Sequence, residues 1–220
     1  PLVAKLRQLW PDLEAIAAAV PADAVAGEVE RGTLPLLLTY PVARSEILVG
    51  KLLAHLAVLA LAVAVGYGLA AAAALWVDPA SLSGLPALAR LGWTSILLGA
   101  TFLGSGYALS SLARRPSGAA GLAMGLWLGA VVLYDLGLLA AVVADDGGWF
   151  TTTAFPFALL ANPADAFRLY NLAASEATAA AAGMAGAAST IPLWQSAASV
   201  LLWPLLALTL ATLAFRKVTP

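Results

Sequence analysis

Four stretches of the chain are apolar over roughly 20 residues or more and carry almost no charge, which is the length that a transmembrane helix needs. They run over residues 52–76, 91–112, 119–143 and 194–215. Because a helix rises about 1.5 Å per residue, each stretch can cross about 30 Å of hydrocarbon. The pattern predicts an all-α, polytopic membrane protein with four clear transmembrane helices.

Charged side chains predict the orientation of these helices. Basic residues cluster at alternate helix ends, whereas the opposite ends are mainly acidic, with Arg90 and Arg168 as exceptions. By the positive-inside rule, the ends before residue 52, around residue 115 and after residue 215 face the cytoplasm. Tryptophans near the outer ends are typical of an aromatic belt. The residues behind this prediction are Arg44, Lys51, Arg114, Arg115, Arg216 and Lys217 inside, and Asp78, Asp145, Asp146, Asp165, Glu176, Trp76, Trp93, Trp149 and Trp194 outside.

Two further segments flank the spans on the cytoplasmic side. Residues 1–25 are not predicted to span, because two acidic residues and a proline interrupt their apolar stretch. The chain opens at Pro1 without a signal-peptide pattern, so we interpret it as the remainder of a longer protein. Residues 26–51 are charged and punctuated by prolines, which predicts an amphipathic element along the membrane face.

The outer segment over residues 144–193 is longer than a connection needs, which predicts structure or function of its own. Asn162 followed by proline is a good helix start, with Asn162 as the N-cap and Asp165 favourable in the first turn. The helix is expected over residues 163–174, with Asp165 and Arg168 one turn apart.

Composition narrows the chemistry that the chain can perform. The 220 residues are 62% hydrophobic and 10% charged with a net charge of −1, so nothing favours a nucleic-acid partner. There is no cysteine, one histidine and two distant methionines, which excludes disulfides, cysteine nucleophiles and a standard transition-metal site built by this chain alone. Gly50-Lys51 is not a phosphate-binding loop, because the first glycine and the final Ser/Thr of that motif are absent. The chain is predicted to be no enzyme and to hold no cofactor or metal of its own.

Polar and small residues inside the predicted spans leave several interpretations open. Asp135 lies about two turns below the outer end of the third span, where it either lines a pathway or makes an interhelical hydrogen bond. His55 lies near the cytoplasmic end of the first span and is interpreted as an interface or packing residue. Gly121, Gly125 and Gly129 form a stripe that predicts close helix packing, within this chain or with another.

A known family shares the cytoplasmic segment. Residues 26–34 read Ala-Gly-Glu-Val-Glu-Arg-Gly-Thr-Leu, and residues 36–51 read Leu-Leu-Leu-Thr-Tyr-Pro-Val-Ala-Arg-Ser-Glu-Ile-Leu-Val-Gly-Lys. Together they resemble the signature that surrounds the coupling helix of ABC-2 type transporter permeases. The resemblance implies a type V exporter-like permease of six spans, with the first missing here and the second degraded, and a cytoplasmic partner ATPase that binds ATP and magnesium.

The same resemblance implies which residues couple the permease to the ATPase. The polar face of the coupling helix would be Glu28, Glu30 and Arg31, and Leu34 with residues 36–38 would seat it in the membrane face. The full set implied for coupling is Glu28, Glu30, Arg31, Gly32, Thr33, Tyr40, Pro41 and Arg44.

The segment between the third and fourth spans resembles one subgroup of these permeases. Residues 157–172 read Phe-Ala-Leu-Leu-Ala-Asn-Pro-Ala-Asp-Ala-Phe-Arg-Leu-Tyr-Asn-Leu, and residues 119–127, 134–136 and 214–217 follow in matching order. They are similar to the permeases of ABC transporters that mature the copper–sulfur site of nitrous oxide reductase.

This narrower resemblance implies a homodimer in the bacterial inner membrane and a periplasmic accessory protein on the outer loops. It implies export of a sulfur species, or ATP-driven remodelling of the periplasmic partner, for assembly of the cluster. The alternatives are an exporter of a drug, lipid or other small molecule, and a membrane scaffold that transports nothing. The residues assigned to docking of the periplasmic partner are Asn162, Asp165, Phe167, Arg168 and Tyr170.

Overall fold

The computed structural model describes residues 21–37, 39, 42–172 and 191–218. In this part of the chain every element is a helix, which confirms the all-α prediction. In order they are α3 (Ala22–Glu30), α4 (Leu34–Leu37), α5 (Arg44–Val77), the 3₁₀-helix η1 (Pro79–Gly84), α6 (Leu85–Leu112), α7 (Pro116–Leu128), the π-helix η2 (Gly129–Leu133), α8 (Tyr134–Asp145), the π-helix η3 (Phe150–Ala154), α9 (Phe155–Leu160), α10 (Pro163–Leu172) and α13 (Leu193–Arg216).

Four helical segments in the described residues are long and apolar enough to cross a membrane, as predicted. They are Arg44–Val77, Pro79–Leu112, Pro116–Asp145 and Leu193–Arg216. The first begins earlier than residue 52, because the Glu46 carboxylate accepts a hydrogen bond of 2.9 Å from the backbone N–H of Ala43 and so caps the helix start. Residues 44–51, assigned from sequence to the coupling segment, therefore form the first turns of α5.

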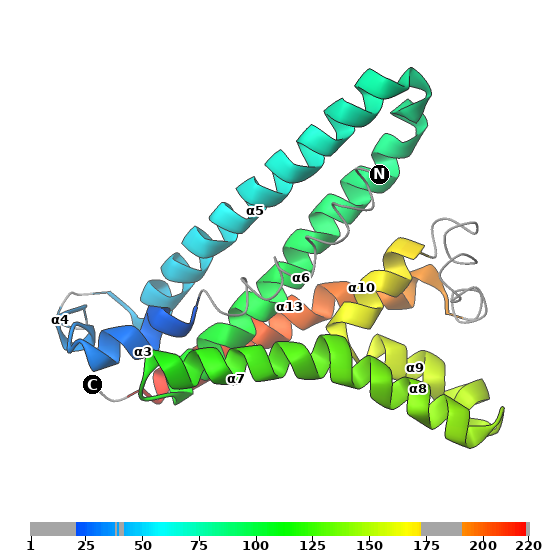
Figure 1. Ribbon diagram of the computed structural model, residues 1–220. Coiled ribbons are helices and arrows are strands. Elements are labelled where there is room, and N and C mark those ends of the chain that lie inside the picture. Colours follow the sequence, from blue (N-terminus) through cyan, green and yellow to red (C-terminus); the bar gives the residue numbers. More distant parts are fainter. Residues whose placement is uncertain (1–20, 38, 40–41, 173–190, 219–220) are drawn as a thin grey trace.

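Helix α6 lies at the centre of the arrangement (Figure 1). It forms a hairpin with α5 and packs against α13 and α10. Its face toward these helices is apolar or small, and Leu98, Phe102, Leu103 and Tyr107 are almost completely buried there. Small residues also allow a close approach, since the backbone of α6 at Gly104 lies directly against that of α13. The core is therefore built around the second span.

The third span is one long helix interrupted by a π-turn, formed by α7, η2 and α8. A Cβ atom added at Gly121, Gly125 or Gly129 would meet no heavy atom within 4 Å among the described residues. Packing of this glycine stripe against another span of the described chain, one of two interpretations left open above, is therefore not observed.

At one end of the molecule α3, the start of α5, the start of α7 and the end of α13 come together, and the charge pattern predicts that this end is cytoplasmic (Figure 1). Leu34 is buried against the other helices there, whereas Leu36 is 65% exposed, so seating of the segment in the membrane face by these leucines stays a prediction. Tyr40 and Pro41 lie outside the described residues, as do residue 38, the stretch before residue 21 and residues 173–190. The fourth span continues as a helix through Pro204.

The predicted orientation can be tested with single cysteines, because the native chain has none. Ser83 in η1, which follows α5, and Ser117 at the start of α7 are both exposed. In spheroplasts, an impermeant thiol reagent should label Ser83→Cys and leave Ser117→Cys unmodified, because the basic ends face the cytoplasm. Lysed membranes serve as the control, in which both should react. Labelling of Ser117→Cys from outside would show that the orientation is reversed.

Candidate functional site

Helix α3 is held at the predicted cytoplasmic end by a side chain from α6. Ser110 Oγ accepts hydrogen bonds from the backbone N–H groups of Val25, at 3.3 Å, and Ala26, at 3.0 Å. Val25 and Ala26 are the fourth and fifth residues of α3, so this hydroxyl bonds the first half of the helix. Val25 and Ala26 are at most 1% exposed, and Ala26 packs against Ala119 of α7. The start of α3 is thus fixed on α6 and α7.

A second contact holds the middle of α3 to α5. Lys51 forms an ion pair with Glu28 and donates a hydrogen bond of 2.9 Å to the carbonyl oxygen of Ala24. The two charged side chains are 25% and 18% exposed. Glu28, expected on a free polar face, instead joins the helix to the first span. This is a correction to its predicted position, and it arises because the sequence alone does not show which basic residue faces it.

The end of α3 explains two residues of the signature. Gly32 has a φ of 67°, in the left-handed region that costs a glycine little. Its N–H bonds the carbonyl oxygen of Val29, and that of Thr33 bonds the carbonyl oxygen of Glu28, at 3.2 and 2.9 Å. This is a Schellman ending, in which the last carbonyl groups are satisfied by the residues after the helix. Gly32 and Thr33 therefore terminate α3.

Glu30 and Arg31 lie on the exposed surface beside this ending. They are charged residues of the signature that the end of α3 leaves exposed, on the side predicted to face the cytoplasm. Arg44 lies elsewhere on the same end, where its Nη1 donates a hydrogen bond of 2.6 Å to the carbonyl oxygen of Val218. It therefore joins the start of α5 to the segment after α13.

His55 lies between the first two spans. Its Nδ1 is 2.7 Å from the hydroxyl oxygen of Tyr107 on α6, and the two rings are 5.8 Å apart. Tyr107 is completely buried, so this contact lies in the packed interface of α5 and α6.

A second cluster of charged side chains lies on the side of the molecule that is predicted to face outward. Arg168 on α10 donates from its Nη1 to Asp135 Oδ2, at 2.5 Å, and to Asp165 Oδ1, at 2.8 Å. Asp135 thus makes an interhelical ion pair, which corresponds to one of the two interpretations of this residue. Burial, followed by the charge of Asp135, raises the pKa of Asp165 to about 7, against the opposing effect of Arg168.

A hydrogen bond joins the residue before α10 to the π-turn of the third span. Asn162 caps α10 as predicted, its Oδ1 accepting from the N–H of Ala164 at 2.9 Å. Its Nδ2 donates to the carbonyl oxygen of Ala130, in η2, at 2.6 Å. A π-turn shifts the backbone hydrogen bonds of a helix, so a carbonyl there can accept from outside. Tyr134 donates from its hydroxyl to the carbonyl oxygen of Ala158, at 2.8 Å.

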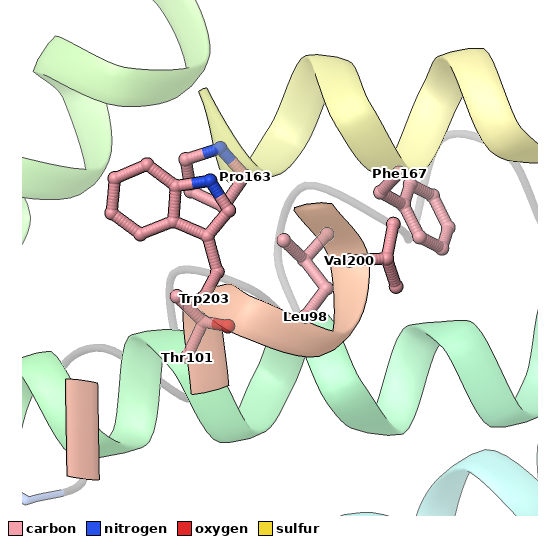
Figure 2. Close-up of a pocket in the computed structure, with 6 residues that line it drawn as sticks. All are labelled: Leu98, Thr101, Pro163, Phe167, Val200 and Trp203. Carbon is pink, nitrogen blue, oxygen red and sulfur yellow. The ribbon is translucent and has the colours of Figure 1, made fainter. Parts of the chain in front are cut away.

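Helix α10 packs into the bundle, whereas a surface helix was expected. Figure 2 shows Pro163 and Phe167 of α10 facing Leu98 of α6 and Val200 of α13. The junction is filled by side chains and leaves no room for a water molecule. Phe167 is 6% exposed, and Asn162 and Asp165 are each 2% exposed.

These placements bear on the assignment of α10 to docking. Asn162, Asp165 and Phe167 use their side chains inside the chain, which corrects their expected exposure. The hydrophobic pattern of a short helix cannot tell a partner protein from the chain's own spans. Arg168 and Tyr170 remain partly exposed. Docking itself stays a prediction.

Sequence reasoning did not assign Ser110 or Lys51 to the site. Lys51, the last residue of the signature, was noted for its charge and in a rejected phosphate-loop pattern, while Ser110 lies 84 residues from its partner Ala26. Among the described residues, no group of three or more acidic or histidine side chains could hold a metal ion.

Known proteins are similar to this chain over most of its length. The sequence profile described as ABC-2 family transporter protein matches residues 13–219. A relative from Pseudomonas aeruginosa, named probable ABC transporter permease protein NosY, is 46% identical over 199 residues, covering 89% of this chain and 72% of the relative. A relative of the same name from Stutzerimonas stutzeri is 43% identical over 202 residues, with the same two coverages.

Proposed function

The chain belongs to the ABC-2 family of transporter proteins, and on this premise we propose that it couples ATP hydrolysis in a partner ATPase to assembly of the copper–sulfur cluster of nitrous oxide reductase. It is a transporter permease, a transport component rather than an enzyme, and such a permease implies an ATPase partner. The single observation that supports the finer function is the similarity to two permeases named NosY over 89% of the chain.

The geometry of the cytoplasmic end supports the coupling part of the proposal. Helix α3 presents Glu30 and Arg31 on its exposed end, while its buried face is joined to α5 through Lys51 and to α6 through Ser110. A force applied to the exposed end would therefore reach two spans directly. ATP and magnesium would be bound by the partner, and the segment over residues 26–51 would be its docking region.

The composition supports movement of sulfur or a mechanical signal rather than copper. Copper(I) in proteins is held by soft thiolate or thioether ligands and by imidazoles. The chain has no cysteine, one histidine and two methionines. We infer export of a sulfur species, or ATP-driven remodelling of a periplasmic accessory protein, by a homodimer in the inner membrane.

A gene deletion tests the copper–sulfur role. In a denitrifying strain without the permease gene, purified nitrous oxide reductase should lack the absorption bands of the copper–sulfur cluster. Reintroducing the full-length gene should restore these bands, and the empty vector serves as the control. A normal cluster in the deletion strain would rule out this role and leave the alternative, an exporter of a drug, lipid or other small molecule.

A further inference from the structure

Two carboxylates and one guanidinium meet where α10 joins the third span. Asp135 and Asp165 both accept from the same nitrogen atom, Nη1 of Arg168, at 2.5 and 2.8 Å. With all three groups ionised, the cluster carries one net negative charge. A negative charge taken out of water is costly unless it is fully paired or neutralised.

The three side chains are buried to different extents, and the most deeply buried carboxylate is the one whose ionised form costs most. The side chain of Asp165 is 3% exposed, whereas those of Asp135 and Arg168 are 39% and 36% exposed. Asp165 Oδ2 is buried and has no hydrogen-bond partner among the described residues. If Asp165 were ionised, this oxygen would have lost its hydrating water and gained no hydrogen-bond donor in exchange. Such burial disfavours the charged form of a carboxyl group and favours its protonated form.

We propose that Asp165, together with Asp135 and Arg168, forms a proton-binding site at the outer end of the permease, in which the proton resides on the buried carboxyl group of Asp165. Arg168 and the more exposed Asp135 then remain as a neutral ion pair. The proton comes from the outer aqueous phase and returns to it, so no other reactant is needed. This inference does not depend on the substrate of the transporter.

The surroundings of Asp165 support a midpoint near neutral pH. Burial and then the charge of Asp135 raise its pKa to about 7. The ionisable groups that face it are Asp135 and Tyr134 of the third span and Arg168 of α10. On α6 the nearest is Arg90, which lies beside Asn171, while α13 has only Arg216 in its last turn, and α9 and η2 have none.

The site would make one of the links between α10 and the third span sensitive to pH. Another link, the hydrogen bond from Asn162 at the start of α10 to Ala130, joins neutral groups. A folded-state pKa above the unfolded value means that the proton stabilises the folded protein at low pH. This stabilisation is complete below the ordinary carboxyl pKa and is lost as pH rises to about 7. We therefore expect α10 to be held less firmly above neutral pH.

Infrared spectroscopy of the purified full-length permease tests the proposal, because a protonated carboxyl group has its own carbonyl stretching band. In the wild type, a component of this band should fall about tenfold between about pH 6 and about pH 8. It should be absent from Asp165→Asn and present in Asp146→Asn. Asp146 is the matched control because it is exposed and has a φ of 45°, which asparagine also tolerates.

A band that titrates equally in Asp165→Asn, or no titrating band in the wild type, would overturn the proposal. If Asp165→Asn does not fold, Asp135→Asn decides. It removes the neighbouring negative charge, so the band should titrate at a lower pH than in the wild type, and an unchanged midpoint would contradict the site.

Discussion

Valine in place of Gly104 should prevent α6 and α13 from packing and should lower the stability of the protein by about 3 kcal/mol. A Cβ atom at Gly104 would lie 3.0 Å from the carbonyl carbon and from the Cβ of Ala207, and 3.2 Å from the backbone nitrogen of Leu208. These are mostly backbone atoms of a helix, so they cannot move aside as a flexible side chain could. The two spans would have to separate along the core of the molecule.

Thermal unfolding of the purified protein measures this effect, with an expected fall in the midpoint of about 10 °C. Gly137→Val is the matched control, since it places the same β-branched residue in a helix where nothing lies within 4 Å of the new Cβ. Equal losses in the two variants would mean that helix propensity, and not the contact with Ala207, explains the result.

The spans could be predicted from sequence because their signals are local. Each contains its own hydrophobic run, and the positive residues at alternate ends give a consistent orientation. The start of α10 was predictable for the same reason, because Asn162 caps a helix that begins at the next residue. Such signals lie within a single segment of the sequence and need no knowledge of the neighbouring helices.

Contacts between distant residues could not be predicted in the same way. Arg168 was an exception in the charge pattern and Asp135 an isolated charge in a span, yet they are each other's partners. Their pairing depends on α10 folding back against the π-turn, which no local pattern shows. The same limit hid Ser110 and Lys51, whose roles appear only once α3 is placed on α5 and α6.

Reversing the charge of Glu28 should uncouple the ATPase from the membrane spans. In Glu28→Lys, two positive side chains would face each other where Lys51 now pairs with Glu28 and with the Ala24 carbonyl group. Loss of such charged contacts costs about 2 kcal/mol, enough to weaken coupling by about tenfold or more. The exposed residues Glu30 and Arg31 would be unchanged, so binding of the ATPase itself should persist.

The charge swap Glu28→Lys with Lys51→Glu separates this effect from simple damage to the helix. The double variant restores an ion pair with the two charges exchanged. It does not restore the hydrogen bond from Lys51 to Ala24, so coupling should recover only in part. Lys51→Glu alone should resemble Glu28→Lys, since each single variant leaves two like charges in contact.

ATP hydrolysis by the full-length permease and its ATPase, reconstituted together in lipid vesicles, is the most direct test of whether α3 transmits the ATPase stroke to the spans. The stimulation of hydrolysis by the permease should fall about tenfold in Glu28→Lys and in Lys51→Glu, with the ATPase still bound, and should recover in part in the double variant. Full stimulation in both single variants, or a double variant that is worse than either, would contradict transmission through the contact between α3 and α5.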